Sequence, residues 1–466
     1  GWGEGGLGVS DGTLVFCKRL IKANSRSVPR TGTSPAAHCG DQNTLCTKSR
    51  FSPATLAGSH VALHPLSCHE DTSQPFIHSC FLGWFFCLAT EGKEEEGKKE
   101  NNPSRVPQGK PGERSSALYS AGQFFFEYLV VVSLKVTDGR YEPKITYQFP
   151  KRENLLKGQK EEEERLLKAI PLFCFPDGNN WAPVTEFTSE TFSFVLTNVD
   201  GSRKIGYCRR LLPSGRGVRL PEVFCIISCL GCFGLFSKIL DEVEKRRQIS
   251  MAVIYPFMQG LRESPFPAPG KTVTIKSFIP ESGTELIELT RPVDAHLEHV
   301  EFQALLQRLS PHLILHIFAS AVLERRLIFL AEELSVLSQC IHAVAALLYP
   351  FTWAHTYIPV VPECLLDTVC CPTPFMVGIQ MRHLERVLDQ PMEEALMVDL
   401  CKGKILRAVG DEEEILPIKL QNEMLASLNR HNNNNNVHSK DNSLYTVKRT
   451  QAAFRRWPES SAKQFA

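Results

Sequence analysis

Three cysteines, Cys225, Cys229 and Cys232, have the CxxxCxxC spacing with which radical-SAM enzymes hold three irons of an iron–sulfur cluster. In such enzymes the motif lies on a loop after the first strand of a repeating βα barrel. Here it begins inside the apolar run VFCIISCLGCF, and no βα repeat follows it. The sequence therefore favours reduced core thiols over an iron–sulfur site.

The segment Gly270-Lys271-Thr272 could end a phosphate-binding loop, in which backbone N–H groups surround a phosphate and the lysine reaches it. That pattern requires a glycine five residues earlier, and this position is Pro265, which lacks an N–H and stiffens the loop. The residues that follow, VTIKSF, predict a strand instead of the required helix. A nucleotide-hydrolysing site is therefore not expected.

Two groups of histidines and cysteines could bind zinc: Cys68, His69, His78 and Cys80, and His355, Cys364, Cys370 and Cys371. Neither group has two CxxC-like pairs at the spacing of a zinc finger. The sequence also has no GxSxG nucleophile elbow, and Glu161 to Glu164 read as the solvated start of a helix. We therefore expect no catalytic residue, no metal and no cofactor.

The polar and aromatic residues Trp353, His355 and Tyr357 lie within LLYPFTWAHTYIPVVP, residues 347–362. In an extended chain they share one side because their spacing is two residues. A hydrogen-bonded place in the core is favoured over a contact surface, and both interpretations stay open.

The composition excludes several classes of protein. The 52 basic and 51 acidic residues are interspersed and give a net charge of +1, so bulk charge does not recruit nucleic acid. The apolar run at 81–89 is well short of the roughly 20 residues that span a membrane. Sixteen scattered cysteines fit a reduced, cytoplasmic protein.

A first folded unit is expected at residues 122–213. The run FFFEYLVVVSL predicts a buried strand, ITYQFP a second one, and EEEERLLKAI a helix that Pro171 stops. Residues 191–212 alternate apolar and polar side chains around Asp200-Gly201, which predicts a β-hairpin. This unit is therefore a small antiparallel sheet with at least one helix.

A second, α/β unit is expected to begin after the linker 214–221, with VFCIISCLGCF as its first strand. Later come a helix with Ser310 as N-cap and Pro311 in its first turn, the strand RRLIFLAE, another helix and the short edge strand YIPVV. Strand, helix and strand in this order predict right-handed crossovers and a mostly parallel sheet covered by helices. The fold class is therefore α/β.

Several long segments resemble the DENN module, and specifically its second subfamily. They are PLFCFPDG at 171–178, residues 192–213, residues 223–240, ISMAVIYPF at 249–257 and, above all, residues 324–379. The resemblance implies an α+β longin-like upstream lobe, a larger α/β lobe and a groove between them. The resemblance divides the chain into 122–213 upstream, 214–362 central, and 363–428 downstream and truncated. The composition of the remaining segments predicts that 1–121 is disordered or uncertain and that 429–466 is a disordered tail.

The resemblance also implies a function. Members of this family are guanine-nucleotide exchange factors for Rab GTPases, and the second subfamily is associated with the Rab-nine type in endosomal vesicle traffic. The expected partner is thus a Rab GTPase, with peripheral recruitment to endosomal membranes. Candidate contact residues are Arg152, Arg203 and, if it is not buried, Trp353. An alternative is a Rab-binding or partner-binding module without exchange activity, because the family continues with further helices where this chain turns into HNNNNNVHSK.

Overall fold

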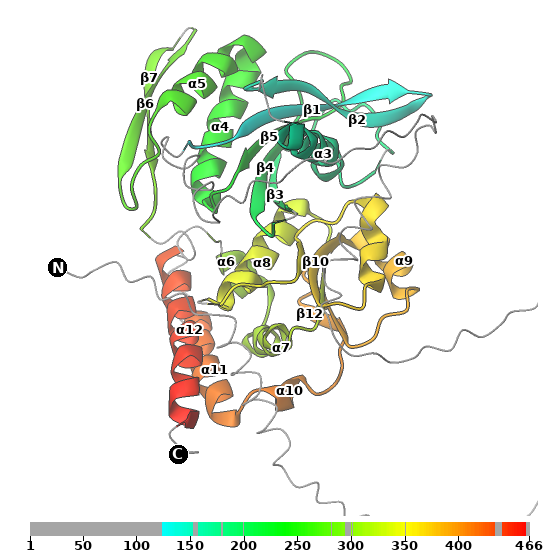
Figure 1. Ribbon diagram of the computed structural model, residues 1–466, viewed down its shortest axis with the longest axis vertical. Coiled ribbons are helices and arrows are strands. Elements are labelled where there is room, and N and C mark those ends of the chain that lie inside the picture. Colours follow the sequence, from blue (N-terminus) through cyan, green and yellow to red (C-terminus); the bar gives the residue numbers. More distant parts are fainter. Residues whose placement is uncertain are drawn as a thin grey trace, which may run out of the picture. The chain divides into compact units, whose positions relative to one another are not determined.

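The computed structural model describes residues 124–462 apart from 152–156, 179, 199, 281, 294–299, 301, 350 and 434–439 (Figure 1). All of these residues belong to the unit formed by Gly1–Arg30 and Leu118–Ala466. The expected disorder of residues 1–121 lies outside the described residues. We call residues 124–293 the first lobe and residues 300–462 the second lobe.

The first lobe is built on an antiparallel sheet with the strand order β2-β1-β5-β4-β3. Its strands are β1 (Tyr128–Thr137), β2 (Arg140–Phe149), β3 (Glu190–Thr197), β4 (Arg203–Leu211) and β5 (Glu222–Ser228). The β1–β2 turn places Asp138 and Gly139 at φ 49° and 76°, the left-handed conformations that a tight hairpin needs. The predicted hairpin around Asp200-Gly201 is confirmed as β3 and β4.

The strand expected to open the second unit, β5, belongs to the first sheet instead. β5 lies between β1 and β4 and pairs antiparallel with both. All seven of its residues are buried, because helices cover both faces of the sheet. A continuous apolar run of this kind shows that a strand is buried on both sides but not which strands it pairs with.

One face of this sheet is covered by α3 (Lys157–Cys174), and the other by α4 (Phe233–Ile249), α5 (Met251–Glu263) and the hairpin of β6 (Thr272–Ile279) and β7 (Gly283–Thr290). The prediction that Pro171 stops the first helix was wrong, because α3 continues to Cys174. Ile170, Phe173 and Cys174 are all buried. Burial of this last turn offsets the hydrogen bond that proline cannot make.

The second lobe contains the mostly parallel sheet that the sequence predicts, with the order β12-β11-β8-β10-β9. Its strands are β8 (Arg326–Ala331), β9 (Thr356–Ile358), β10 (Phe375–Gln380), β11 (Ala395–Asp399) and the antiparallel β12 (Lys404–Arg407). Around it lie α6 (Phe302–Arg308), α7 (Pro311–Val322), α8 (Leu334–Leu347), the 3₁₀ helices η1 (Glu363–Cys370) and η2 (Met381–His383), and α9 (Leu384–Leu388). The predicted N-cap is confirmed, since Ser310 Oγ accepts from Leu313 N at 3.3 Å.

The expectation of a disordered tail at 429–466 was also wrong within the described residues. After α10 (Glu412–Ile415), two helices lie side by side, α11 (Ile418–Asn433) and α12 (Lys440–Ala462) (Figure 1). Val447, Ala453 and Phe454 of α12 are buried, and the Phe454 ring packs edge-on against Phe318 of α7 at 5.0 Å. This apolar stripe accounts for a helix in an otherwise polar segment.

Candidate functional site

The two lobes meet where β3 and the start of β4 pack against α8 and residues 353–357, a region that we call the seam. Apolar residues of both lobes, including Phe192 and Phe194 of β3 and Leu337 and Ile341 of α8, belong to one continuous core. At the start of α8, the Ser335 N–H donates to Glu190 Oε1 at 3.1 Å. A carboxylate at a helix N-terminus is favourable because the helix dipole is positive there.

A buried histidine links both lobes at the centre of the seam. His342 Nε2 lies 3.0 Å from Ser193 Oγ of β3, and His342 Nδ1 lies 2.7 Å from the Tyr357 hydroxyl. A neutral imidazole has one donor and one acceptor, which two hydroxyl groups can match in either tautomer. Burial lowers the pKa of His342 to about 3, so the ring is neutral at physiological pH.

Arg203, at the start of β4, fastens the hairpin to the second lobe. Its Nη2 donates to the carbonyl oxygens of Trp353 at 2.6 Å and His355 at 3.1 Å. Its guanidinium also lies 5.2 Å from the centre of the Tyr357 ring. Burial lowers the pKa of Arg203, but the charge is held by these carbonyl groups and the ring face. Arg203 is thus positioned to fix the lobes to each other.

The predicted contact residues fall in different places. Trp353 is only 4% exposed and its Nε1 donates to Thr356 O at 3.0 Å. It was a candidate contact residue only if it was not buried, and this condition is not met. Tyr357 is also buried, whereas the His355 side chain is 28% exposed and lies 3.2 Å from a Glu324 oxygen. Arg152 lies outside the described residues. The structural interpretation of the 353–357 segment therefore holds for Trp353 and Tyr357.

The residues after Gly270-Lys271 form the predicted strand, whereas Cys229, one of the three cysteines predicted to be core thiols, is exposed. Gly270 has φ 74° in a turn, and the strand β6 begins at Thr272, so no helix follows the Gly-Lys-Thr segment. Cys225 and Cys232 are buried and Cys229 is exposed, and the three do not gather into one group of ligands. The first of the two possible zinc groups, at residues 68–80, lies outside the described residues.

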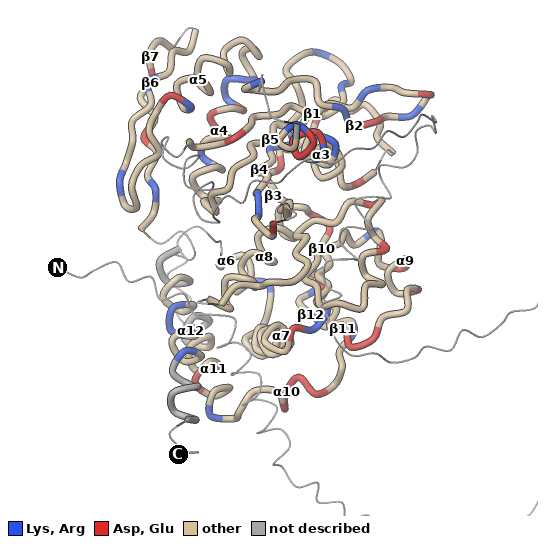
Figure 2. The backbone as a smooth tube through the Cα atoms, viewed as in Figure 1, with Lys and Arg blue, Asp and Glu red and all other residues tan. Residues whose placement is uncertain are grey.

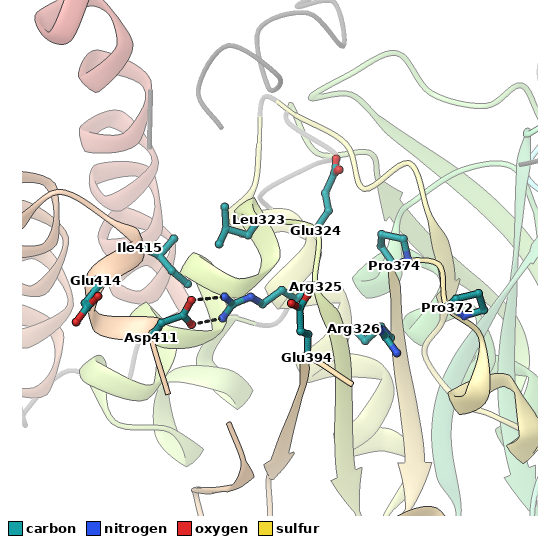
Figure 3. Close-up of a pocket in the computed structure, with 10 residues that line it drawn as sticks. All are labelled: Leu323, Glu324, Arg325, Arg326, Pro372, Pro374, Glu394, Asp411, Glu414 and Ile415. Carbon is teal, nitrogen blue, oxygen red and sulfur yellow. Dashed lines mark hydrogen bonds and ion pairs between the residues drawn. The ribbon is translucent and has the colours of Figure 1, made fainter. Parts of the chain in front are cut away.

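A cleft of about 430 Å³ lies at the amino-terminal ends of β8, β10 and β11 (Figure 3). Its lining residues are Leu323, Glu324, Arg325, Arg326, Pro372, Pro374, Glu394, Asp411, Glu414 and Ile415. Ligands of open α/β sheets bind at the carboxyl ends of the strands, which is the opposite edge. In Figure 3, Arg325 makes two hydrogen bonds to Asp411, both 2.6 Å long, so this guanidinium is already occupied. The cleft does not resemble a nucleotide site.

Positive and negative charges are interspersed among the described residues, since Lys and Arg alternate with Asp and Glu along the chain of both lobes (Figure 2). Among the described residues, no helix has the length and apolar character that crossing a membrane requires.

His342 is expected to make stability depend on pH. Between about pH 6.5 and the folded pKa of about 3, the unfolded chain binds a proton at His342 that the folded chain does not. Acidification through this range should therefore lower the free energy of unfolding by up to about 1.4 kcal/mol per pH unit. Denaturant titrations of the wild type and His342→Gln at pH 7.5 and 5.5 measure this contribution. We expect the variant to lose about 1 kcal/mol less than the wild type over this interval.

His312→Gln is the matched control because it removes an exposed histidine from the neighbouring helix α7. It should retain the pH dependence of the wild type. Equal pH dependence of the wild type and His342→Gln would show that His342 does not titrate on unfolding.

Comparison with known proteins identifies the class to which this arrangement belongs. Residues 143–211 match the family model of the uDENN domain, and residues 219–403 match that of the DENN (AEX-3) domain. The chain therefore belongs to the DENN domain family. Proteins of this family generally act as exchange factors that regulate Rab GTPases by binding them.

The similarity to individual members is high. Over 338 residues the chain is 72% identical to DENN domain-containing protein 2D of Homo sapiens, which covers 72% of this chain and 71% of that protein. The mouse protein of the same name is 71% identical over 342 residues, or 73% of this chain and 72% of that protein. DENN domain-containing protein 2B of Homo sapiens is 59% identical over 309 residues, 66% of this chain and only 27% of that protein.

Proposed function

We propose that this protein is a guanine-nucleotide exchange factor that promotes GDP release from a Rab GTPase of the Rab-nine type in endosomal vesicle traffic. It works in the cytoplasm and is recruited to endosomal membranes as a peripheral protein. The observation that carries the proposal is that a match to the uDENN domain is followed by a match to the DENN domain in one chain, whose two lobes share one continuous core.

Exchange requires binding but no covalent chemistry. An exchange factor binds the GTPase most tightly when the nucleotide is absent, because it holds the switch segments where phosphate and magnesium are poorly coordinated. By thermodynamic reciprocity, incoming GTP weakens the complex and releases the factor. Each tenfold gain in release rate needs only about 1.4 kcal/mol of differential binding, which a protein interface readily supplies.

The seam supports this mechanism because two lobes can distort a bound GTPase only if they keep their positions relative to each other. The His342 hydrogen bonds and the bonds of Arg203 to two carbonyl groups resist a shift of the hairpin relative to α8. We propose that Arg203 and Trp353 act from within the seam as positioning residues. We propose Arg152 as a residue that contacts the Rab GTPase.

The proposal is tested by the release of fluorescently labelled GDP from a Rab-nine type GTPase and from a panel of other Rabs. Addition of the full chain should accelerate release from the Rab-nine type protein and less so from the others. Saturable binding without faster release from any Rab would instead select a binding module. That alternative was based on a truncated downstream part, but residues 418–433 and 440–462 form helices that pack on the second lobe.

Arg203→Ala tests the role of the seam in exchange. It removes two charge-assisted hydrogen bonds and the contact with the Tyr357 ring, so the lobes should yield when the GTPase binds. We expect the second-order rate constant of GDP release to fall about tenfold, which corresponds to about 1.4 kcal/mol.

Arg216→Ala is the control, since Arg216 is an exposed arginine in the loop before β5. It should exchange nucleotide at the wild-type rate. An Arg203→Ala variant that is folded and equally active would show that the seam does not limit exchange.

A further inference from the structure

Three cysteines that are distant in the sequence converge inside the first lobe. The sulfur atoms of Cys174, Cys208 and Cys225 all lie within 4.8 Å of one another, and the Cys174 and Cys208 sulfurs are 4.0 Å apart. A tetrahedral zinc site with Zn–S bonds of about 2.3 Å places its sulfurs roughly 3.8 Å apart. The observed spacing is therefore close to that of a thiolate metal site.

Rigid elements hold each of the three thiols. Cys208 of β4 and Cys225 of β5 are directly opposite each other in the antiparallel register, so their side chains point to the same face of the sheet. Cys174 is the last residue of α3, the helix that covers this face. Ligands on packed strands and helices are preorganised, which lowers the entropic cost of binding an ion.

The surroundings exclude water and place one cation nearby. All three cysteines have 0% exposed surface within the apolar core. Arg210 is two residues after Cys208 on β4 and lies on the same face, where its charge acts on Cys174. Both terminal nitrogens of Arg210 donate hydrogen bonds to the Asp177 carboxylate. The buried Nε–H of Arg210, in contrast, has no hydrogen-bond partner in the described part of the chain. A neighbouring guanidinium lowers the cost of burying thiolate charge.

We propose that Cys174, Cys208 and Cys225 bind one soft d10 metal ion, Zn²⁺ or Cu⁺, through three thiolates. Soft thiolate ligands favour these two ions over hard cations such as Mg²⁺ and Ca²⁺. Zinc would neutralise more of the thiolate charge, whereas cuprous copper accepts three sulfur ligands without a fourth. Among the described residues, no further histidine, cysteine or carboxylate joins the group. The site is closed to solvent, so the ion enters as the first lobe folds, and its binding releases the thiol protons.

Ordinary core packing is the competing explanation, because buried cysteines often serve as small apolar residues. Cys232 and Cys340 fit that explanation, since both are buried and neither belongs to a group of potential ligands within the described part of the chain. The three thiols of the site differ because they face one another from three separate elements.

Metal analysis of the full chain tests the proposal. The protein is produced in cells supplied with zinc or, separately, with copper, and is purified without oxygen and desalted against a mild chelator. We expect about one metal ion per chain in one of the two preparations. X-ray absorption at the edge of that metal should show only sulfur neighbours, at about 2.3 Å for zinc.

Cys208→Ala removes one ligand and should reduce the metal content at least tenfold. Cys340→Ala is the matched control, because it deletes another buried thiol and should retain the metal. If Cys208→Ala does not fold, the absorption spectrum of the wild type decides, since nitrogen or oxygen neighbours would assign the metal to another place. Wild-type protein without metal in both preparations would overturn the proposal and leave three core thiols.

Discussion

The Gly378→Ala variant is expected to lose at least about 3 kcal/mol of its free energy of unfolding, or not to fold. A Cβ atom at this position would lie 2.0 Å from the backbone oxygen of Pro359 and 2.6 Å from Ile341 Cδ1. Real carbon and oxygen atoms do not approach so closely without repulsion. Since the nearest atom belongs to the backbone, no side-chain rotation relieves the clash.

The neighbouring structure has little freedom to move away. Gly378 lies in the middle of β10, which pairs with β8 on one side and β9 on the other. The Gly378 carbonyl oxygen also accepts from Val361 N at 2.8 Å. This hydrogen bond holds the segment after β9, which contains Pro359, against the position where the new Cβ would lie. A shift of Pro359 would therefore break sheet contacts as well as core packing.

Denaturant titration followed by circular dichroism measures this loss. Gly158→Ala is the control, because no atom lies within 4 Å of a Cβ at this position in the exposed first turn of α3. It should be neutral or should stabilise the protein by up to about 1 kcal/mol. If Gly378→Ala unfolded at the denaturant concentration of Gly158→Ala, the close approach of Pro359 would be refuted.

Local signals in the sequence were sufficient for most secondary structure. The Asp200-Gly201 turn, the Ser310 cap and the alternating strands act through neighbouring residues, and the structure contains them where they were predicted. The partner strands of β5 were not predictable in this way, since a fully apolar strand fits either sheet. The helix α12 was missed because its stabilising contacts, such as that of Phe454 with Phe318, join residues far apart in the sequence.

The candidate site was predicted less well for the same physical reason. The sequence predicts an exposed Arg203 near a hairpin turn, yet its partners are carbonyl groups 150 and 152 residues further along the chain. His342 lies on the buried face of α8, and nothing in its neighbours shows that Ser193 and Tyr357 will meet it. Cys174 and Cys208 are 34 residues apart, so no short spacing pattern contains them.

Arg246→Ala is expected to lower the free energy of unfolding by about 3 kcal/mol. The Arg246 side chain is fully buried, and its Nη1 donates to the Glu242 carboxylate at 2.6 Å and to the Glu242 carbonyl at 2.9 Å. Its guanidinium lies 4.3 Å from the centre of the Phe257 ring, and its Nε donates to Ser277 Oγ at 3.3 Å. Truncation would leave a cavity where α4, α5 and β6 meet and would deprive a buried hydroxyl of its partner.

Two further variants separate the causes of this loss. Arg246→Met keeps most of the apolar stem, so it should lose only about 1 to 2 kcal/mol if packing is the larger contribution. Lys245→Ala, on the same helix, breaks an ion pair with Glu285 whose lysine is 49% exposed, and it should cost under about 1 kcal/mol. Because the described contacts of Arg246 are with Glu242, Phe257 and Ser277, Arg246→Ala should unfold more easily yet exchange nucleotide normally per folded molecule. If Arg246→Ala is as stable as Lys245→Ala, the buried guanidinium contributes no net stability. The free-energy cost of its desolvation would then equal the stabilisation from its contacts.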